Sequence, residues 1–365
     1  MKRIGLRNQK QGIDKKLFLA TVFLVIIGLI SVLDASAPQA LSVFGDKFYL
    51  FKNQLVWSFV GFVALLVSSK INYKFWQKLA TPLFFFVLVS LVLVLIPGIG
   101  AKFLGARRWI SIDPIFFQPS EVAKFGLILY LAKLMSKKEA SILYFLPLVI
   151  VSFLIMLEPD LGTTMVIVLT GAIQIFVSQI NLLHYTGVGI LGGLVVFGLV
   201  MLSPYRKDRL LTFLEQSSDP LGKSYHIRQI LLGLGSGGLL GVGLGGSRQK
   251  FLFLPEASTD SIFAVVAEEI GFIGALGLII LLGFYVFRAL RIAKYAPDGF
   301  SRYLALGIGS WIGIQTILNI ASMTALVPLT GIPLPFITYG GSTLVKIMFA
   351  TGIILNKSKQ SKKYS

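Results

Sequence analysis

The sequence predicts an all-α polytopic membrane protein of about ten transmembrane helices, with a large extracytoplasmic loop between helices 7 and 8. Hydrophobic residues make up 55% of the 365 residues, charged residues only 14%, and the mean hydropathy is +0.81. Soluble domains of this size do not have such a composition. A helix needs about 20 apolar residues to cross a bilayer. Apolar runs near this length cover 17–35, 49–69, 79–97, 119–135, 142–157, 161–178, 186–203, 262–287, 303–323 and 341–356.

The charged residues between these runs predict the organisation and orientation of the chain. We expect a basic tail over 1–16, one membrane domain over 17–356 with a long outer loop at about 204–261, and a second basic tail over 357–365. Lysine and arginine are retained in short cytoplasmic loops. With ten spans, both tails fall on the side that holds most of these residues, so both termini are predicted to be cytoplasmic. The first apolar run lacks a small-residue cleavage site and is predicted to stay as a span.

Charge and composition also exclude several classes of ligand. The net charge of +18 is explained by topology and by anionic lipid headgroups, so membrane lipids are expected partners and nucleic acid is not. The chain has no cysteine and only two histidines, His184 and His226, which are far apart in sequence. A zinc site is therefore not expected, and any metal would be a hard cation held by carboxylates.

Four acidic residues lie within fourteen positions, where the outer loop meets the apolar run that begins at 262: Glu256, Asp260, Glu268 and Glu269. Carboxylates at or inside a bilayer are costly, so this cluster is a functional-site hypothesis. A simpler explanation exists for one of them, because Ser258, Thr259, Asp260 or Ser261 could cap the following helix. Capping does not explain the other three carboxylates.

A second group of charges follows the third apolar run. Arg107 and Arg108 lie beside Trp109, where arginines and aromatic residues are common as interfacial anchors. They also suit a pyrophosphate, because guanidinium groups offer fork geometry to phosphate oxygens. Glu121 and Lys124 are three residues apart, hence on one helix face. We expect them to form an ion pair that faces an internal polar cavity, since lipid exposure would be costly.

Two further outer segments contain polar residues with more than one explanation. Asp160 follows a proline and could simply cap the next helix. The second half of the long loop mixes glycine, basic and aromatic residues. It could line a groove for a lipid with an anionic headgroup, using His226, Arg228, Arg248 and Lys250. The last outer loop contains Pro333 and Pro335 and cannot be helical there.

Five motifs, in order and spread over nearly the whole chain, resemble those of the SEDS family (shape, elongation, division and sporulation). They are GARRWI, FQPSEVAK, EPDLGT, GSGGLLGVGLGGSRQKFLFLPEASTDSIFAVVAEE and GIPLPFITYGGS. Two stretches, SRQKFLFLPE and LVPLTGIPLPFITYGGS, are more similar to the division branch, FtsW, than to the elongation branch, RodA.

The resemblance implies a peptidoglycan glycosyltransferase that polymerises lipid II at the outer face of the bacterial cytoplasmic membrane. It also implies a class B penicillin-binding transpeptidase as partner, together with other proteins of a division or elongation complex. The catalytic acid of the family motif, usually His-Thr-Asp-Phe-Ile, falls on Asp260. This chain departs from the motif at Ser258, where histidine is usual, and at Ser261, where phenylalanine is usual.

The chemistry of the residues agrees with this implied activity. An inverting transfer needs a base for the acceptor hydroxyl, and a carboxylate in a partly dry, outward-facing site can serve. The leaving undecaprenyl pyrophosphate needs cations, for which the candidates are Arg107, Arg108, Lys124, Arg248 and Lys250. Glu121 would hold Lys124 in place. Asp160, Ser258 and Thr259 are predicted to be supporting residues of the site.

Glu256 would tune Asp260 or share a divalent cation with it, Mg²⁺ or Mn²⁺, whereas Glu268 and Glu269 would be structural partners of buried polar groups. No nucleotide, haem or zinc is expected. Two alternatives use the same residues differently. A lipid II flippase would move the lipid without chemistry, and a scaffold of the division complex would need none of these side chains.

Overall fold

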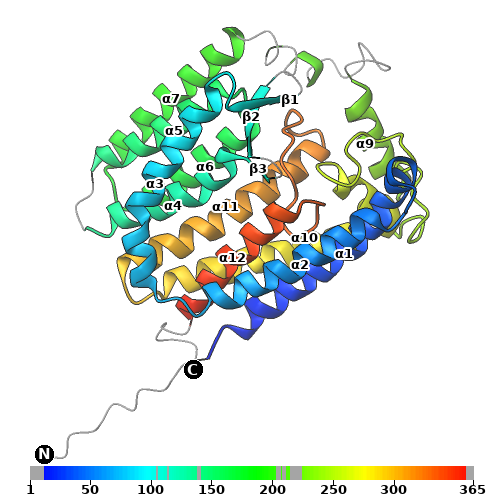
Figure 1. Cartoon of the computed structure of the whole chain (residues 1–365), viewed down its shortest axis with the longest axis horizontal. Helices are drawn as coiled ribbons and strands as arrows, with labels where there is room; N and C mark the ends of the chain where they lie inside the picture. Colours follow the sequence, from blue (N-terminus) through cyan, green and yellow to red (C-terminus); the bar gives the residue numbers. More distant parts are fainter. Residues whose placement is uncertain are drawn as a thin grey trace, which may run out of the picture.

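The computed structural model describes residues 12–103, 106–112, 115–137, 141–202, 207, 211–213 and 224–358. Within them the chain is a bundle of helices with one small sheet (Figure 1). Each of the ten predicted apolar runs falls on a helix. The helices are α1 (Lys15–Phe44), α2 (Tyr49–Ser68), α3 (Tyr73–Leu95), α4 (Pro119–Met135), α5 (Phe145–Leu157, after a 3₁₀ turn), α6 (Leu161–Val177), α7 (Leu182–Leu202), α9 (Tyr225–Ser236), α10 (Ile262–Lys294), α11 (Gly299–Met323) and α12 (Gly341–Ser358).

Among the described residues, five helices are long and apolar enough to cross a membrane by length and composition: α1, α2, α3, α10 and α11. Shorter apolar helices lie at 142–157, 161–177 and 182–195. Large apolar side chains on the outer surface of the bundle, such as Phe59 and Phe153, are more than half exposed. A soluble protein would not expose so many, so this surface suits lipid. The chain is a multi-pass membrane protein.

Helix α11 runs through the middle of the bundle, with α1, α2 and α12 on one side and α3 to α7 on the other (Figure 1). It packs against α10, α4, α6 and α12. Most of its length is buried, including polar residues such as Gln315 and Asn319. Buried polar groups must find hydrogen-bond partners inside the protein. The polar side chains of α11 can therefore bond groups on the elements that pack around it.

The two described ends of the chain meet at one end of the bundle. The backbone N–H of Asp14, which caps α1, donates to Ser358 Oγ at 2.9 Å, and Arg288 of α10 donates to the Asp14 carboxylate at 2.6 Å. Both described ends therefore lie on the same side of the membrane. The remaining residues of the two basic tails, 1–11 and 359–365, lie outside the described residues.

Three features differ from the sequence prediction. The segment after α3 is a three-stranded antiparallel sheet, β1 (Gly100–Phe103), β2 (Ala106–Ile112) and β3 (Ile115–Phe117), where only a loop was expected. Helix α1 continues past the predicted end at 35 to Phe44, through Pro38. Helix α10 runs to Lys294 and is kinked at Gly271, whose φ is 68°. The sheet and the roughly two and a half extra turns of α1 bring polar groups to the outer end of the bundle.

The glycine-rich segment of the long loop fills the kink in α10. The N–H of Val242 donates to Glu268 O at 3.0 Å, and the N–H of Phe272 donates to Gly238 O at 2.9 Å. A Cβ on Gly271 would lie 2.3 Å from the backbone nitrogen of Gly241. Glycine is therefore required at Gly271 for this close approach.

Candidate active site

Asp260 lies in the tight loop that leads into α10. Ser261, not Asp260, occupies the helix cap position, and its side chain makes no capping bond. The Ser261 hydroxyl instead contacts His226 Nε2 at 2.8 Å, so α9 is joined to this loop. Of the four predicted cap candidates, it is therefore Ser261 that holds the cap position of α10, and Asp260 lies one residue before it.

Three contacts join the Asp260 loop to the last outer loop, 324–340. The Asn319 side-chain amide donates to the backbone oxygens of Asp260 at 2.9 Å and of Ile332 at 2.7 Å. The N–H of Tyr339 donates to Ser258 O at 2.9 Å. Gly331, with a φ of 66°, lies so close to Asp260 that a Cβ there would be 3.4 Å from Oδ2. The proline-rich loop therefore forms one wall beside the carboxylate.

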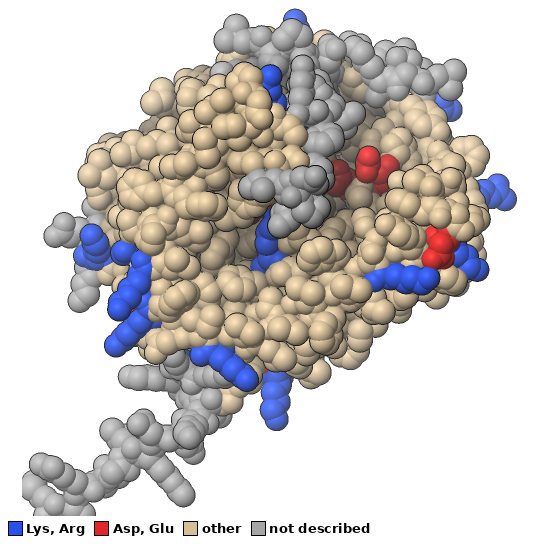
Figure 2. All heavy atoms as spheres, viewed as in Figure 1, with Lys and Arg blue, Asp and Glu red and all other residues tan. Residues whose placement is uncertain are grey.

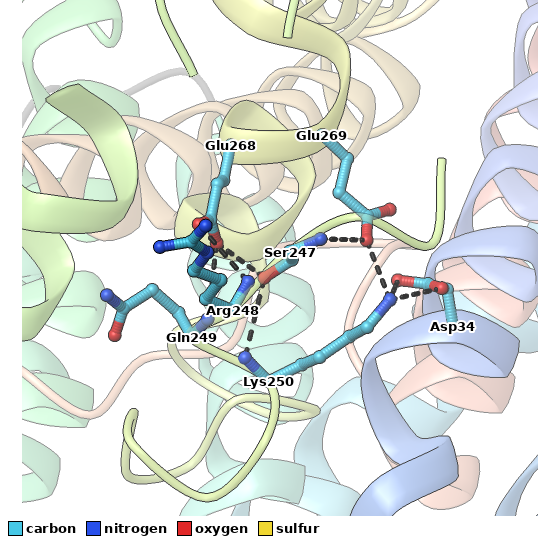
Figure 3. A network of polar contacts seen from close by, with 7 residues as sticks. All are labelled: Asp34, Ser247, Arg248, Gln249, Lys250, Glu268 and Glu269. Atoms are coloured by element: carbon cyan, nitrogen blue, oxygen red, sulfur yellow. Dashed lines mark hydrogen bonds and ion pairs between the residues drawn. The ribbon is translucent and has the colours of Figure 1, made fainter. Parts of the chain in front are cut away.

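The segment 247–250 is held against α10 by Glu268 and Glu269 (Figure 3). Glu268 accepts from the Ser247 hydroxyl and from the backbone N–H of Arg248 at 3.2 Å. Glu269 accepts from the N–H of Ser247 at 3.1 Å. These two carboxylates are therefore partners of buried polar groups, as predicted, and they stabilise the loop.

Lys250 is the cation of this network. Its ammonium group lies 2.7 Å from Asp34 Oδ1 of α1 and 2.8 Å from Glu269 Oε1 (Figure 3). Burial disfavours the charge, but the hydrogen bonds to Asp34 and Glu269 raise the pKa of Lys250 above its ordinary value. The structure therefore places Lys250 in an internal ion-pair network. The sequence suggested that Lys250 binds a pyrophosphate, but its ammonium group is already paired with two carboxylates.

The Lys250→Met variant is expected to lose about 3–5 kcal/mol of unfolding free energy, because two carboxylates would remain without their cation. The Lys250 and Glu269 side chains are each 4% exposed. The measurement is a denaturant titration of the purified protein in detergent. Lys52→Met is the matched control, since the Lys52–Asp46 pair is exposed and such pairs contribute little. Equal midpoints for wild type and Lys250→Met would contradict the structural role.

Glu121 and Lys124 form the predicted ion pair, with 2.6 Å between Nζ and Oε1 and with both side chains buried. Lys346 of α12 approaches the other carboxylate oxygen at 3.7 Å and is 28% exposed. The sequence did not suggest Lys346, because it lies more than 200 positions from Glu121 on an apolar helix. Two lysines thus share one glutamate, which leaves a net positive charge in the bundle.

The cavity beside Lys124 differs from the prediction. It was expected to be polar, but its walls are mainly apolar because α4, α6 and α11 meet there through aliphatic side chains. The lining residues are Lys124, Leu127, Ile128, Val166, Ile167, Thr170, Gly171, Gln174 and Trp311. Figure 2 shows a hollow on the face of the molecule that it draws, with a basic side chain in it and acidic side chains near its rim.

Arg108 lies on β2 and holds the turn between α5 and α6. Its Nε and Nη2 donate to the backbone oxygens of Glu158 at 3.1 Å and Pro159 at 2.6 Å. The turn is unusual, since Pro159 has a φ of 23°. The guanidinium group is thus engaged with protein backbone, which favours the structural explanation for Arg108 over pyrophosphate binding. Arg107 precedes it on β2 and is half-buried.

Burial raises the pKa of Glu158 in this turn to about 9, with a further increase from Asp160 and an opposing effect of Arg108. The folded protein therefore keeps a proton that the unfolded chain releases above its ordinary pKa of 4.5. The contribution of Glu158 to the free energy of unfolding is therefore complete below pH 4.5. It is lost as the pH rises towards about 9.

The Glu158→Gln variant is expected to remove this pH dependence, because glutamine is neutral throughout. Its thermal midpoint should fall less than that of wild type between pH 5 and pH 9. Melting curves of both proteins in the same detergent test this expectation. Parallel declines in the two proteins would contradict it.

The remaining predicted site residues have clear positions. Asp160 caps α6, accepting from the N–H of Thr163 at 3.0 Å. Glu256 is exposed and accepts from the Thr259 hydroxyl at 2.6 Å. Ser258 donates to Gln39 of α1 at 3.2 Å. Arg248 is exposed, and its backbone N–H donates to Glu268. Asp34, Gln39, Asn319 and Lys346 were missed by the sequence analysis, because each contacts the site from a distant helix.

A bound divalent cation would need several oxygen ligands. Within the described residues, no group of three or more His, Asp or Glu side chains lies close enough together to hold a metal. The described residues therefore do not form a complete metal site from protein ligands alone. Mg²⁺ is often held by one or two carboxylates and by substrate phosphates, which is the only arrangement that Asp260 and Glu256 would fit.

Comparisons with known proteins agree with the geometry. The sequence profile of the FtsW, RodA and SpoVE family, described as cell cycle proteins, matches residues 15–363. Stage V sporulation protein E of Bacillus subtilis is 42% identical, over 97% of this chain and 99% of that protein. A probable peptidoglycan glycosyltransferase FtsW of Trichlorobacter lovleyi is 41% identical, over 94% of this chain and 93% of that protein.

Solved structures share the fold. A chain from a structure on the coordination of polymerization and crosslinking by a peptidoglycan synthase complex superposes with a TM-score of 0.77 at 28% identity. It covers 96% of this chain and 99% of that chain. Rod shape determining protein RodA of Thermus thermophilus gives a TM-score of 0.71 at 27% identity, over 96% of this chain and 98% of that chain. The higher identity to the FtsW and SpoVE relatives agrees with the predicted branch. The chain belongs to the FtsW, RodA and SpoVE family of cell cycle proteins, the SEDS family.

Proposed function

We propose that the chain is a peptidoglycan glycosyltransferase that polymerises lipid II at the outer face of the cytoplasmic membrane, with both termini in the cytoplasm. The observation that supports this most is the arrangement along α11. Asp260 is fixed by Asn319 near one end of this helix, and Lys124 lies 5.5 Å from the Trp311 ring further along it. A carboxylate and a buried cationic group thus flank one region. That is what a base and a leaving-group site require.

In the proposed step, Asp260 takes the proton from the 4-hydroxyl of the acceptor N-acetylglucosamine. The hydroxyl oxygen attacks the anomeric carbon of the donor chain with inversion, and the bond from that carbon to the pyrophosphate oxygen breaks. Undecaprenyl pyrophosphate leaves with the electron pair, and the proton passes from Asp260 to water. The polymer grows by one disaccharide unit.

The cations beside Glu121 suit the leaving pyrophosphate. Glu121 balances one of its two lysines, so the group of Glu121, Lys124 and Lys346 has a net positive charge. An anion bound there would complete the pairing, which is favourable in a medium of low dielectric constant. Arg107 and Arg248 are further candidates for the donor or acceptor headgroup. No step in this scheme depends on a divalent cation, which would be held by Asp260, Glu256 and the pyrophosphate.

The partners follow from the relatives. Because a similar chain occurs in a peptidoglycan synthase complex that couples polymerization to crosslinking, we propose a class B penicillin-binding transpeptidase as partner. Other proteins of a division or elongation complex would join it. The polymerase role itself resides in this chain, since the proposed base and cations are all its own.

The test uses the purified chain with its transpeptidase partner in vesicles that contain labelled lipid II. We expect glycan strands on the side where Asp260 is exposed. Lipid II that crosses the bilayer without being joined would support a flippase instead. Neither strands nor transfer across the bilayer would leave only a scaffold role and would contradict the proposal.

A further inference from the structure

Three buried polar side chains follow one face of α11 at four-residue spacing: Trp311, Gln315 and Asn319. They are 1%, 0% and 0% exposed. Residues four apart on a helix are neighbours, and the first two of these side chains are hydrogen-bonded to each other. Trp311 Nε1 donates to Gln315 Oε1 at 2.9 Å. Polar groups buried in a membrane helix are costly unless they are bonded, so a continuous polar stripe in the central helix needs an explanation.

The stripe ends at the loops around Asp260. Gln315 donates to the backbone oxygen of Pro333 at 2.9 Å, and Asn319 donates to those of Ile332 and Asp260. A proline-rich loop cannot satisfy its own carbonyl groups by forming a helix. The stripe supplies those donors, and the Asn319 amide bonds a backbone oxygen of each loop. Together with the direct bond from the Tyr339 N–H to Ser258 O, this amide sets the position of Asp260 relative to the last outer loop.

The other end of the stripe lies at the cation site. The Lys124 ammonium group lies 5.5 Å from the centre of the Trp311 ring, within the range of a cation–π interaction. Lys124 is in turn paired with Glu121. From Trp311 to Asn319 the helix rises about 12 Å at 1.5 Å per residue. One rigid element thus carries contacts to both the proposed base and the proposed pyrophosphate site.

We propose that Asn319, supported by Gln315 and Trp311, is a positioning residue that sets the place of Asp260 relative to Lys124. This inference rests on the proposed function, because it assumes that both groups act on one substrate pair. The base must meet the acceptor hydroxyl while the cations hold the donor's pyrophosphate about one sugar away. A displacement near 1 Å in such an arrangement costs about 100-fold in rate.

The test is steady-state polymerisation of labelled lipid II by the full chain with its transpeptidase partner. Asn319→Ala is expected to lower kcat by roughly 100-fold with little change in KM. Asn319→Asp, which has the same size but no donor, should be as impaired, and Asn319→His, which keeps an N–H donor, should recover part of the rate. Thr316→Val is the matched control. Thr316 is buried on the same helix, and within the described part of the chain its hydroxyl bonds only the backbone of Ile312.

A structural readout complements the kinetic assay. The chain has no cysteine, so spin labels on Leu252→Cys and Leu326→Cys report the distance between the two loops. Both side chains are exposed, at 67% and 74%. The milder Gln315→Met variant should broaden this distance distribution and lower kcat, because it removes the bond to Pro333. An unchanged distribution with wild-type kcat would overturn the proposal.

Other outcomes separate this inference from the proposed function. Wild-type kcat in Asn319→Ala, or an equal loss in Thr316→Val, overturns the positioning role even if Asp260→Asn is inactive. Wild-type kcat in Asp260→Asn, measured in parallel, overturns the proposed function itself.

Discussion

Replacing Asp260 with asparagine is expected to lower the rate of glycan polymerisation by on the order of 10²–10⁴-fold, the range that a general base contributes. Asparagine keeps the size of the side chain but cannot accept the proton. The contacts that hold the loop use the backbone oxygen of Asp260 and the N–H of Tyr339, so the fold should remain. The measurement is the initial rate of strand formation from labelled lipid II, with lipid II binding measured separately.

The control is Asp46→Asn at the outer end of α1. Asp46 is an exposed carboxylate paired with Lys52 and contacts none of the proposed site residues in the described structure. Its loss should leave the rate unchanged. A similar loss of rate in both variants would mean that negative charge near the outer surface matters, and not the base at Asp260.

Replacing Lys124 with methionine is expected to have the second largest effect, on the order of 10²–10³-fold in kcat. The variant removes the buried cation proposed to face the leaving pyrophosphate. Glu121 keeps Lys346 as a counter-ion at 3.7 Å, so the fold should tolerate the change better than the loss of an isolated pair. The same polymerisation assay measures the effect.

Lys133→Met provides the comparison on the same helix. Lys133 lies nine positions further along α4 and donates to Thr81 at 2.7 Å, away from the stripe on α11. Its rate should equal that of wild type. If Lys124→Met polymerised lipid II normally, the pyrophosphate would have to be held elsewhere, with Arg107 and Arg248 as the remaining outer-face candidates.

The sequence allowed the helices to be predicted and singled out Asp260 as the proposed base, because both signals are local. Apolar runs mark the helices wherever they occur, and Asp260 lies within a motif that can be recognised without its surroundings. The separate role of Glu268 and Glu269 was also predictable, since both lie within an apolar helix and need partners there. The family resemblance added the activity that these features alone do not specify.

The partners of each charge could not be predicted, because they come from distant helices. Lys250 meets Asp34 across 216 positions, and Asn319 joins two loops that no local pattern relates. Arg108 looked equally suited to phosphate or to an interfacial role until its bonds to Glu158 and Pro159 were seen. The small sheet was missed for a similar reason, since its short strands are stabilised by pairing and not by a clear alternation in sequence.

The most direct test of the account is the glycan product made by the purified wild-type chain and by its Asp260→Asn variant, each with the transpeptidase partner and the same labelled lipid II. We predict long strands from the wild type and none above background from the variant, which should still bind lipid II. Strands made by the variant at the wild-type rate, or no strands from the wild type, would contradict the claim that this chain polymerises lipid II through Asp260.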